Sequence, residues 1–280
     1  ADTFTVTTAG LTSADTIAGG DGTDVISTSN AATYVDSDFT NVTTVETLTN
    51  AATNGANIVT LGSLADAAGI ATITGVGTGV DTVTVGAGFD NALLVTLGTG
   101  NDDITASASA AAVTFAAAAA SINASDTLLG GTGSSDVFKV TADSDSTGLV
   151  FGASATGIET ITVVADTTNT VKITTVDGNV TDTTGSLTVD GSALTSTAAV
   201  MTFISAEDST ATINVTGGAG ADALTMGVEK SNYSGGGGAD TFTVTTAGLT
   251  SDDTIAGGDG TDVISTSNAA TYVDSDFTNV

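Results

Sequence analysis

The sequence predicts an all-β protein, a parallel β-roll or β-solenoid with calcium bound in glycine–aspartate turns. Three observations predict this fold: a recurring nine-residue glycine–aspartate pattern, aspartates spaced nine or eighteen residues apart, and short alternating apolar runs between the turns. Glycines allow tight turns, and alternating runs form strands that bury every second side chain. A regular spacing then stacks each coil of the chain on the one before it.

The pattern reads Gly-Gly-x-Gly-x-Asp-x-apolar-x. The segments that match it in full are 19–27, 217–225, 235–243 and 257–265. The segments that match it without the first glycine are 76–84, 85–93 and 97–105. Two weaker matches are 10–18, which keeps only the aspartate and the apolar residue, and 130–138, which has one extra residue before the aspartate.

The spacing of the aspartates indicates stacked coils that bind metal. Asp15 and Asp24 are nine residues apart, and Asp222 and Asp240 are eighteen apart, so two nonapeptides make one coil. Stacked turns would bring carboxylates and backbone carbonyls around one ion, and calcium takes six to eight such oxygens. Since Asp262 follows Asp240 by 22 residues, we expect isolated calcium sites and not an unbroken row. The candidate calcium ligands are Asp24, Asp222, Asp240, Asp262, Asp81, Asp90, Asp102, Asp15, Asp136 and Asp2.

A long internal repeat frames the chain. Residues 1–42 recur at 239–280, an offset of 238, and Asp252 in place of Ala14 is the one difference. The repeat predicts a window on a tandem array with a unit of about 238 residues; the alternative is a single subunit with a terminal duplication.

No Pro- or Ser-rich linker divides the chain, so we expect one continuous solenoid over 1–280. Its calcium-roll blocks would be 1–42, 73–105 and 217–265. Residues 43–72 would form Ala/Thr-rich strands and turns, and 126–216 an irregular solenoid without calcium. The Ala-rich stretch 106–125 favours a helix by propensity, but thin solenoid strands fit equally well.

Composition excludes several classes of function. The chain has no Cys, His or Arg, which removes zinc fingers, Ser–His and Cys–His nucleophile pairs, and haem or iron–sulfur ligation. Its net charge of −29 would repel a phosphate backbone, so we expect no nucleic-acid partner. The longest nearly apolar stretch, 110–122, is too short for a membrane span. We do not expect an enzyme.

The nonapeptides resemble the RTX calcium-binding repeats of secreted bacterial proteins. In addition, Asp136-Val137-Phe138, Ile158-Glu159-Thr160-Ile161 and Asp190-Gly191-Ser192, leading in that order to segment 217–225, resemble the RTX module of bacterial surface-layer proteins. The resemblance implies a parallel β-roll, calcium between stacked turns, and folding driven by calcium after export.

The sequence and the resemblance together lead us to expect an extracellular structural protein of the bacterial cell surface. It would assemble with copies of itself, in a calcium-dependent manner, into a surface layer, sheath or filament. Attachment to a cell-surface glycan or lipopolysaccharide would use regions not present in this sequence. The alternatives are a calcium-dependent adhesin, an ice- or polysaccharide-binding solenoid and, less favoured, an enzyme acting on polysaccharide. The Gly-Thr-Gly-Asn-Asp run at 98–102 is similar to repeats of ice-binding solenoids, but it occurs once.

Overall fold

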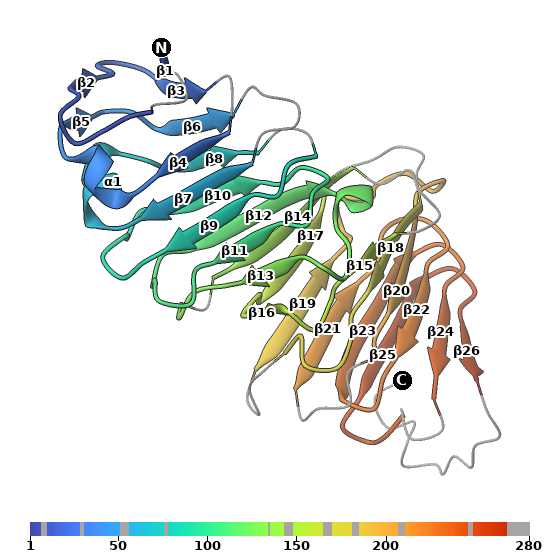
Figure 1. Cartoon of the computed structure of the whole chain (residues 1–280). Coiled ribbons are helices and arrows are strands. Elements are labelled where there is room, and N and C mark those ends of the chain that lie inside the picture. The colour runs from blue at the N-terminus through green and yellow to red at the C-terminus, as the bar shows by residue number, and fades with distance from the viewer. Residues whose placement is uncertain are drawn as a thin grey trace. The chain divides into compact units, whose positions relative to one another are not determined.

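A computed structural model shows the fold of the chain (Figure 1). The residues that it describes are 1–6, 10–28, 31–50, 56–75, 78–133, 135–142, 148–164, 170–180, 185–206, 211–245 and 249–267. The chain forms two compact units. The first comprises residues 1–117 and 125–137, and the second comprises 118–124 and 138–280.

The first unit is a parallel β-solenoid. One sheet has the strand order β1-β3-β6-β8-β10-β12, a second has β13-β11-β9-β7-β4, and β2 pairs with β5. The chain therefore alternates between sheets as it winds. The elements are β1 (Thr3–Val6), β2 (Ile17–Ala18), β3 (Val25–Thr28), β4 (Ala32–Tyr34), the 3-10 helix η1 (Asp36–Phe39), β5 (Val42–Thr43), β6 (Thr47–Asn50), β7 (Asn57–Leu61), α1 (Ser63–Ala68), β8 (Thr72–Thr74), β9 (Thr82–Val85), β10 (Leu93–Thr96), β11 (Asp103–Thr105), β12 (Val113–Ala118) and β13 (Thr127–Leu129).

The second unit is also a solenoid of parallel strands. Its two sheets have the orders β14-β17-β19-β21-β23-β25 and β15-β18-β20-β22-β24-β26. The elements are the 3-10 helix η2 (Ala119–Ser121), β14 (Val137–Ala142), β15 (Leu149–Val150), β16 (Ala155–Thr156), β17 (Thr160–Val163), β18 (Thr170–Thr174), β19 (Ser186–Asp190), β20 (Val200–Ile204), β21 (Thr212–Thr216), β22 (Ala223–Met226), β23 (Lys230–Gly237), β24 (Thr241–Val244), β25 (Thr254–Asp259) and β26 (Val263–Thr266).

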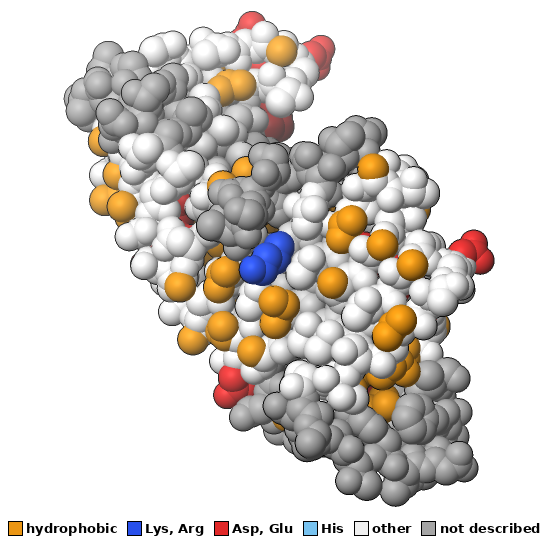
Figure 2. All heavy atoms as spheres, turned by 90° about the vertical axis from the view of Figure 1, so that its right-hand side faces the viewer, with side chains coloured by type: hydrophobic (Ala, Val, Ile, Leu, Met, Phe, Trp, Pro, Cys, Tyr) orange, Lys and Arg blue, Asp and Glu red, His pale blue; other side chains and the backbone are white. Residues whose placement is uncertain are grey.

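The alternating runs explain the strands. In β20, for example, Met201 and Phe203 are fully buried, whereas the residues between them are half-buried. In-register pairing continues this alternation from coil to coil: Leu187 lies beside Ile213 and Phe203 beside Leu224. Each unit thus has a narrow apolar core between its sheets. The outer surface consists mainly of short polar side chains, as the face in Figure 2 shows.

The prediction of an all-β parallel solenoid is confirmed. The Ala-rich stretch, for which helix and strand were both open, contains strand β12 over Val113–Ala118. Residues 43–72, expected as strands and turns, include the six-residue helix α1 as well. It ends at Gly69, whose φ of 100° closes the helix in the left-handed conformation.

The two copies of the internal repeat share the pairing of their first and last strands, whereas β2 of the first copy pairs with β5 and the corresponding β25 of the second pairs with β23. Strands β1 and β3 pair in the register Thr3↔Val25, and β24 and β26 pair in the identical register Thr241↔Val263. The tandem-repeat architecture is therefore present in the structure as well as in the sequence. Residues 268–280 of the second copy lie outside the described residues.

Candidate metal-binding turns

The candidate aspartates stand at the junction of a turn and a strand. Asp102 precedes the buried Ile104 by two residues, and Asp240 precedes the buried Phe242 in the same way. Side chains two apart on a strand share one face. Because the apolar side chain points into the core, the carboxylate two residues before it also points inward. The candidate aspartates buried in this way are Asp24, Asp81, Asp102, Asp136, Asp222 and Asp240.

A ladder of hydrogen bonds links these carboxylates from coil to coil. Asp240 Oδ1 accepts the backbone N–H of Asp222 at 2.8 Å, and Asp262 Oδ1 accepts that of Asp240 at 3.0 Å. The same relation holds in the first unit, where Asp102 Oδ1 accepts the N–H of Asp81 at 2.9 Å. We call this arrangement the carboxylate ladder. Its further rungs run from the N–H groups of Asp2, Asp24, Asn57, Asp102, Val113, Met201 and Ser231 to the carboxylates of Asp24, Glu46, Asp81, Asp126, Asp136, Asp222 and Asp253, respectively.

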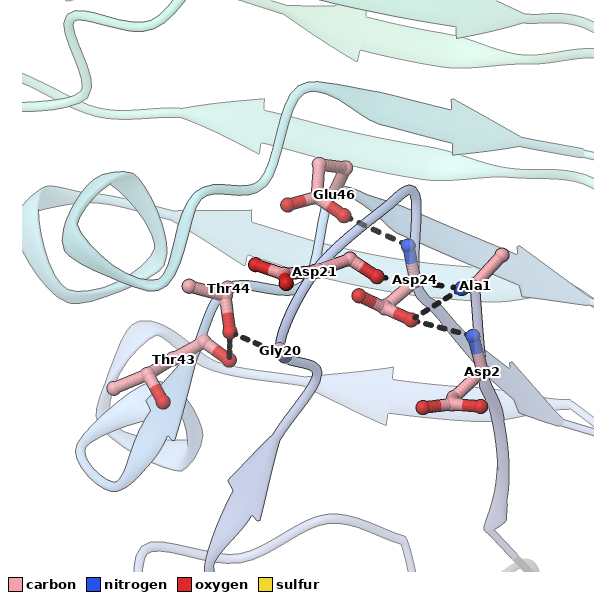
Figure 3. Close-up of polar contacts among 8 residues, drawn as sticks. All are labelled: Ala1, Asp2, Gly20, Asp21, Asp24, Thr43, Thr44 and Glu46. Atoms are coloured by element: carbon pink, nitrogen blue, oxygen red, sulfur yellow. Dashed lines mark hydrogen bonds and ion pairs between the residues drawn. The ribbon is translucent and has the colours of Figure 1, made fainter.

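Figure 3 shows the turn around Asp24. Asp24 Oδ1 accepts the N–H of Asp2, and the N–H of Asp24 donates to Glu46 Oε2 at 2.7 Å. Beside them, the N–H of Gly20 donates to Thr44 Oγ1 at 2.8 Å. Three successive coils therefore meet at Asp24, which is fully buried.

The aspartates fall into two groups by whether the second carboxylate oxygen, Oδ2, has a hydrogen-bond partner. In Asp222 and Asp136, Oδ2 accepts the N–H of Gly218 or Gly131, each at 2.6 Å. In Asp24, Asp102 and Asp240, Oδ2 is buried without a hydrogen-bond partner. Burying a carboxylate oxygen without a partner costs folding free energy. A proton or a cation bound to Oδ2 would therefore stabilise the second group.

The free oxygens lie beside glycines and backbone carbonyls. A Cβ added at Gly235 would overlap Asp240 Oδ2 and would lie 2.5 Å from the carbonyl oxygen of Gly257 in the next coil. A Cβ at Gly19 would likewise collide with the carbonyl oxygen of Thr44 and lie 2.7 Å from Asp24 Oδ2. Glycine is therefore required at positions 19 and 235 because the two oxygens converge there, whereas the match at 97–105, which contains Asp102, has Leu97 at the first position.

Burial changes the acidity of these groups. It raises the pKa of Asp102 and of Asp222 from 3.8 to about 6, because desolvation and neighbouring carboxylates outweigh the backbone N–H donors. Desolvation also raises the pKa of Asp81, Asp136 and Asp240. The ladder thus places carboxylates where their negative charge is disfavoured.

The other candidates have different surroundings. Asp15 is exposed and its Oδ2 accepts the N–H and hydroxyl of Thr12, which closes a local turn. Asp90 is exposed, and its N–H donates to Asp66 Oδ1 at 2.8 Å. Asp2 is exposed and Asp262 half-buried. Across the described ranges, no three acidic side chains gather in a group that could hold an ion.

The oxygens at the free-oxygen turns suit calcium in type. Each of the turns at Asp24 and Asp240 offers a carboxylate oxygen and a carbonyl oxygen of the next coil, and hard oxygen ligands of this kind are those that calcium takes. Asp24 with the carbonyl of Thr44, and Asp240 with that of Gly257, would hold the ion. An ion at Asp240 would supply a positive charge to that carboxylate, whereas Asp24 Oδ1 lies 3.8 Å from the ammonium group of Ala1.

Sequence reasoning missed several members of the ladder. Glu46 and Asp126 accept N–H groups of the preceding coil as Asp24 does, and Asp253 accepts that of Ser231 at 2.7 Å. Asp36 and Asp66 bind backbone N–H groups of neighbouring coils in a related way. Four of the five stand outside every match, and Asp253 stands in the second copy of the weak match 10–18, at the position of Asp15. A different signal would have found three of them: Glu46, Asp126 and Asp253 each stand two residues before a buried apolar residue.

Comparisons with protein-family models, with curated proteins and with solved structures find no match to this chain. Among the described residues, no helix has the length and apolar character needed to cross a membrane.

Proposed function

We propose that this chain is a structural protein of the bacterial cell surface, which assembles with copies of itself into a surface layer, sheath or filament. The observation that carries the proposal is the pair of repeat copies. Asp24 and Ile26 of the first copy are fully buried beneath the next coil, whereas their counterparts Asp262 and Ile264 are only half-buried. Conversely, Asp2 is exposed and its counterpart Asp240 is fully buried.

The repeated segment has a leading face, toward the coil before it in the chain, and a trailing face, toward the coil after it. The second copy shows the leading face in contact with a neighbouring coil, and the first copy shows the trailing face in contact with one. In the second copy, β22 covers the leading face through the pairing Ala223↔Thr241. In the first copy, β6 covers the trailing face through the pairing Val25↔Thr47. A segment that accepts a coil on either face is what a repeating assembly requires, because each added coil leaves an edge that accepts the next.

We also propose that calcium stabilises this assembly. The buried Oδ2 atoms of Asp24, Asp102 and Asp240 have no hydrogen-bond partner, and the 32 acidic residues have only three Lys to offset them. Bound cations would relieve both costs. Extracellular calcium modules work at about 10⁻⁴–10⁻³ M calcium, so we expect the effect at millimolar calcium.

The experiment is to purify the chain in chelator, add millimolar calcium, and follow assembly by sedimentation and electron microscopy. We expect an ordered layer or fibre with calcium and none with magnesium at equal ionic strength. A protein that stays monomeric in millimolar calcium at every concentration would refute the proposed function.

One observation favours the binding-solenoid alternative. On the outer face of β17, β19, β21, β23 and β25, uncharged polar side chains stand in register, and Asn232 Nδ2 donates to Asn214 Oδ1 at 2.8 Å. The row consists of Thr160, Thr188, Asn214, Asn232 and Thr254. Retention on an insoluble polysaccharide or on ice that Thr188→Lys abolishes, without loss of fold, would support this alternative.

A further inference from the structure

A buried glutamate lies in the turn between β22 and β23, outside the glycine–aspartate turns. Glu229 is only 3% exposed. Its Oε1 accepts the hydroxyl of Ser205, from the coil before it, at 2.6 Å, and its Oε2 is buried without a hydrogen-bond partner. Neither residue belongs to a match of the nine-residue pattern. The proposed calcium turns therefore leave this carboxylate without a role.

The groups that face Glu229 in the described part of the chain are acidic or neutral. They are Asp253, from the coil after it, and Tyr233 of β23. Asp253 is itself buried, and its two oxygens accept three hydrogen bonds, one of them from the N–H of Ser231 at 2.7 Å. Burial raises the pKa of Tyr233 well above its ordinary value of 10.0, so the phenol stays neutral. Lys230, the next residue in the chain, is exposed.

A proton on Glu229 fits these surroundings better than a negative charge does. Burial raises the pKa of Glu229 above 4.5, and the charge of Asp253 acts in the same direction, against the hydroxyl of Ser205 and the N–H groups of Glu229 and Gly227. A hydroxyl can donate to a carboxylate or accept from a carboxylic acid, so the contact with Ser205 persists in both states. The ladder aspartates differ, because they bind backbone N–H groups, which can only donate.

We propose that Glu229 is a protonation switch in the second unit: its neutral form holds the turn between β22 and β23 against the end of β20, and its ionised form leaves the core and opens that turn. The path to water is short, because Val228 on one side of Glu229 is 46% exposed and Lys230 on the other side is exposed as well. The carboxylate can therefore reach solvent through a local change while the paired strands stay in register. The switch depends neither on self-assembly nor on calcium.

The direction of the pH effect follows from the raised pKa. Below about pH 4.5, the Glu229 carboxyl group is neutral in both the closed and the open turn, and the closed turn has its full stability. As the pH rises from 4.5 through the pKa of the closed form, opening releases a proton and becomes up to about tenfold more favourable for each pH unit. The switch is therefore closed in acid and open at higher pH.

The proton on Glu229 can be observed directly, because the sequence contains four glutamates, Glu46, Glu159, Glu207 and Glu229. Carboxyl-¹³C labelling of glutamate in the full chain in excess chelator gives four NMR signals to follow between pH 4 and 8, and Glu229→Gln identifies one of them by removing it. We expect that signal to titrate above pH 4.5. Ser205→Ala should move its midpoint higher still, since the Ser205 hydroxyl lowers the pKa. A Glu229 signal that titrates at or below pH 4.5 would overturn the proposal.

Hydrogen exchange measures the opening of the turn. In the native chain, the protection factor of the amides of 226–231 should fall by up to about tenfold for each pH unit just above pH 4.5, whereas in Glu229→Gln it should keep its low-pH value. Asp252→Asn is the matched control, because it removes one negative charge at an exposed position beside Asp253, and it should follow the native chain.

Equal pH dependence of exchange in the native chain and in Glu229→Gln would overturn the switch, and so would loss of that dependence in Asp252→Asn. Should Glu229→Gln not fold, Ser205→Ala keeps the test decisive. Its fall in protection should extend to higher pH than in the native chain, together with the midpoint of its Glu229 signal. A fall over the unchanged pH range would overturn the proposal.

Discussion

Replacing Asp102 by Asn should stabilise the metal-free protein at neutral pH. Burial raises the pKa of Asp102 from 3.8 to about 6, a difference of about two units at ~1.4 kcal/mol each. Since the folded-state pKa is raised, the stabilising contribution is complete below about pH 3.8 and is lost as the pH rises through about 6. The ionised side chain therefore costs up to about 3 kcal/mol at pH 7.5.

Asn at position 102 stays neutral and keeps a carbonyl oxygen for the N–H of Asp81. Its amide nitrogen takes the place of Oδ2, which has no partner to lose. We therefore expect Asp102→Asn to exceed the native protein in unfolding free energy by up to about 3 kcal/mol at pH 7.5 in chelator, and to equal it near pH 4.

Asp222→Asn is the matched control. The pKa of Asp222 is also raised to about 6, but both of its oxygens accept N–H groups, from Met201 and Gly218. The amide would leave one of those N–H groups facing a second donor, at a cost of about 1–3 kcal/mol that offsets the gain. Urea denaturation followed by circular dichroism between pH 4 and 8 in chelator measures both variants. An Asp102→Asn protein no more stable than the native one at pH 7.5, or an equal gain for Asp222→Asn, would refute the reasoning.

Three further predictions concern calcium, the turns and the core. At pH 7, millimolar calcium should raise the urea midpoint and the β signal in circular dichroism above their values in excess chelator, so equal stability with and without calcium would contradict the calcium proposal. Gly235→Ala should lower the unfolding free energy by about 1–3 kcal/mol because its Cβ would overlap Asp240 Oδ2. Gly237→Ala should cost less, since the atom nearest to its Cβ would be 3.6 Å away. Equal losses of unfolding free energy in urea denaturation would argue against the crowded turn. Phe242→Ala should lower the unfolding free energy by about 3–5 kcal/mol and Phe4→Ala by distinctly less, since only Phe242 is fully buried. Thermal unfolding tests this, and equal shifts of the melting temperature in the two variants would contradict it.

The sequence predicts the architecture of this chain better than the chemistry of its turns. Alternation in runs such as 241–244 determines which side chains face the core, and glycine–aspartate spacing determines that coils stack in parallel. The partners of each carboxylate are a different matter. Whether Oδ2 meets an N–H group, as in Asp222, or none, as in Asp240, depends on the backbone orientation of the glycine turn just before the aspartate. The nine-residue pattern is identical at the two sites, so no local signal separates them.

Elements outside the pattern were harder to predict for a related reason. Helix α1 lies in the Ala/Thr-rich stretch 43–72, for which strands and turns were predicted. The carboxylate that accepts the N–H groups of Gly62 and Ala65 comes from Asp36 in another coil. Glu46 escaped the pattern because its turn has no glycine pair. Contacts between residues more than 20 positions apart determine both cases.

The carboxylate ladder holds each coil to its neighbour at a single point, and this leaves the length of the coil free. Successive rungs are 18 residues apart between Asp222 and Asp240 but 24 apart between Asp102 and Asp126. The 24-residue step from Asn57 to Asp81 even contains helix α1. We therefore expect the outer turns to accept inserted peptides without loss of the stacking. On an assembled surface, such insertions would be displayed at a density set by the coils themselves.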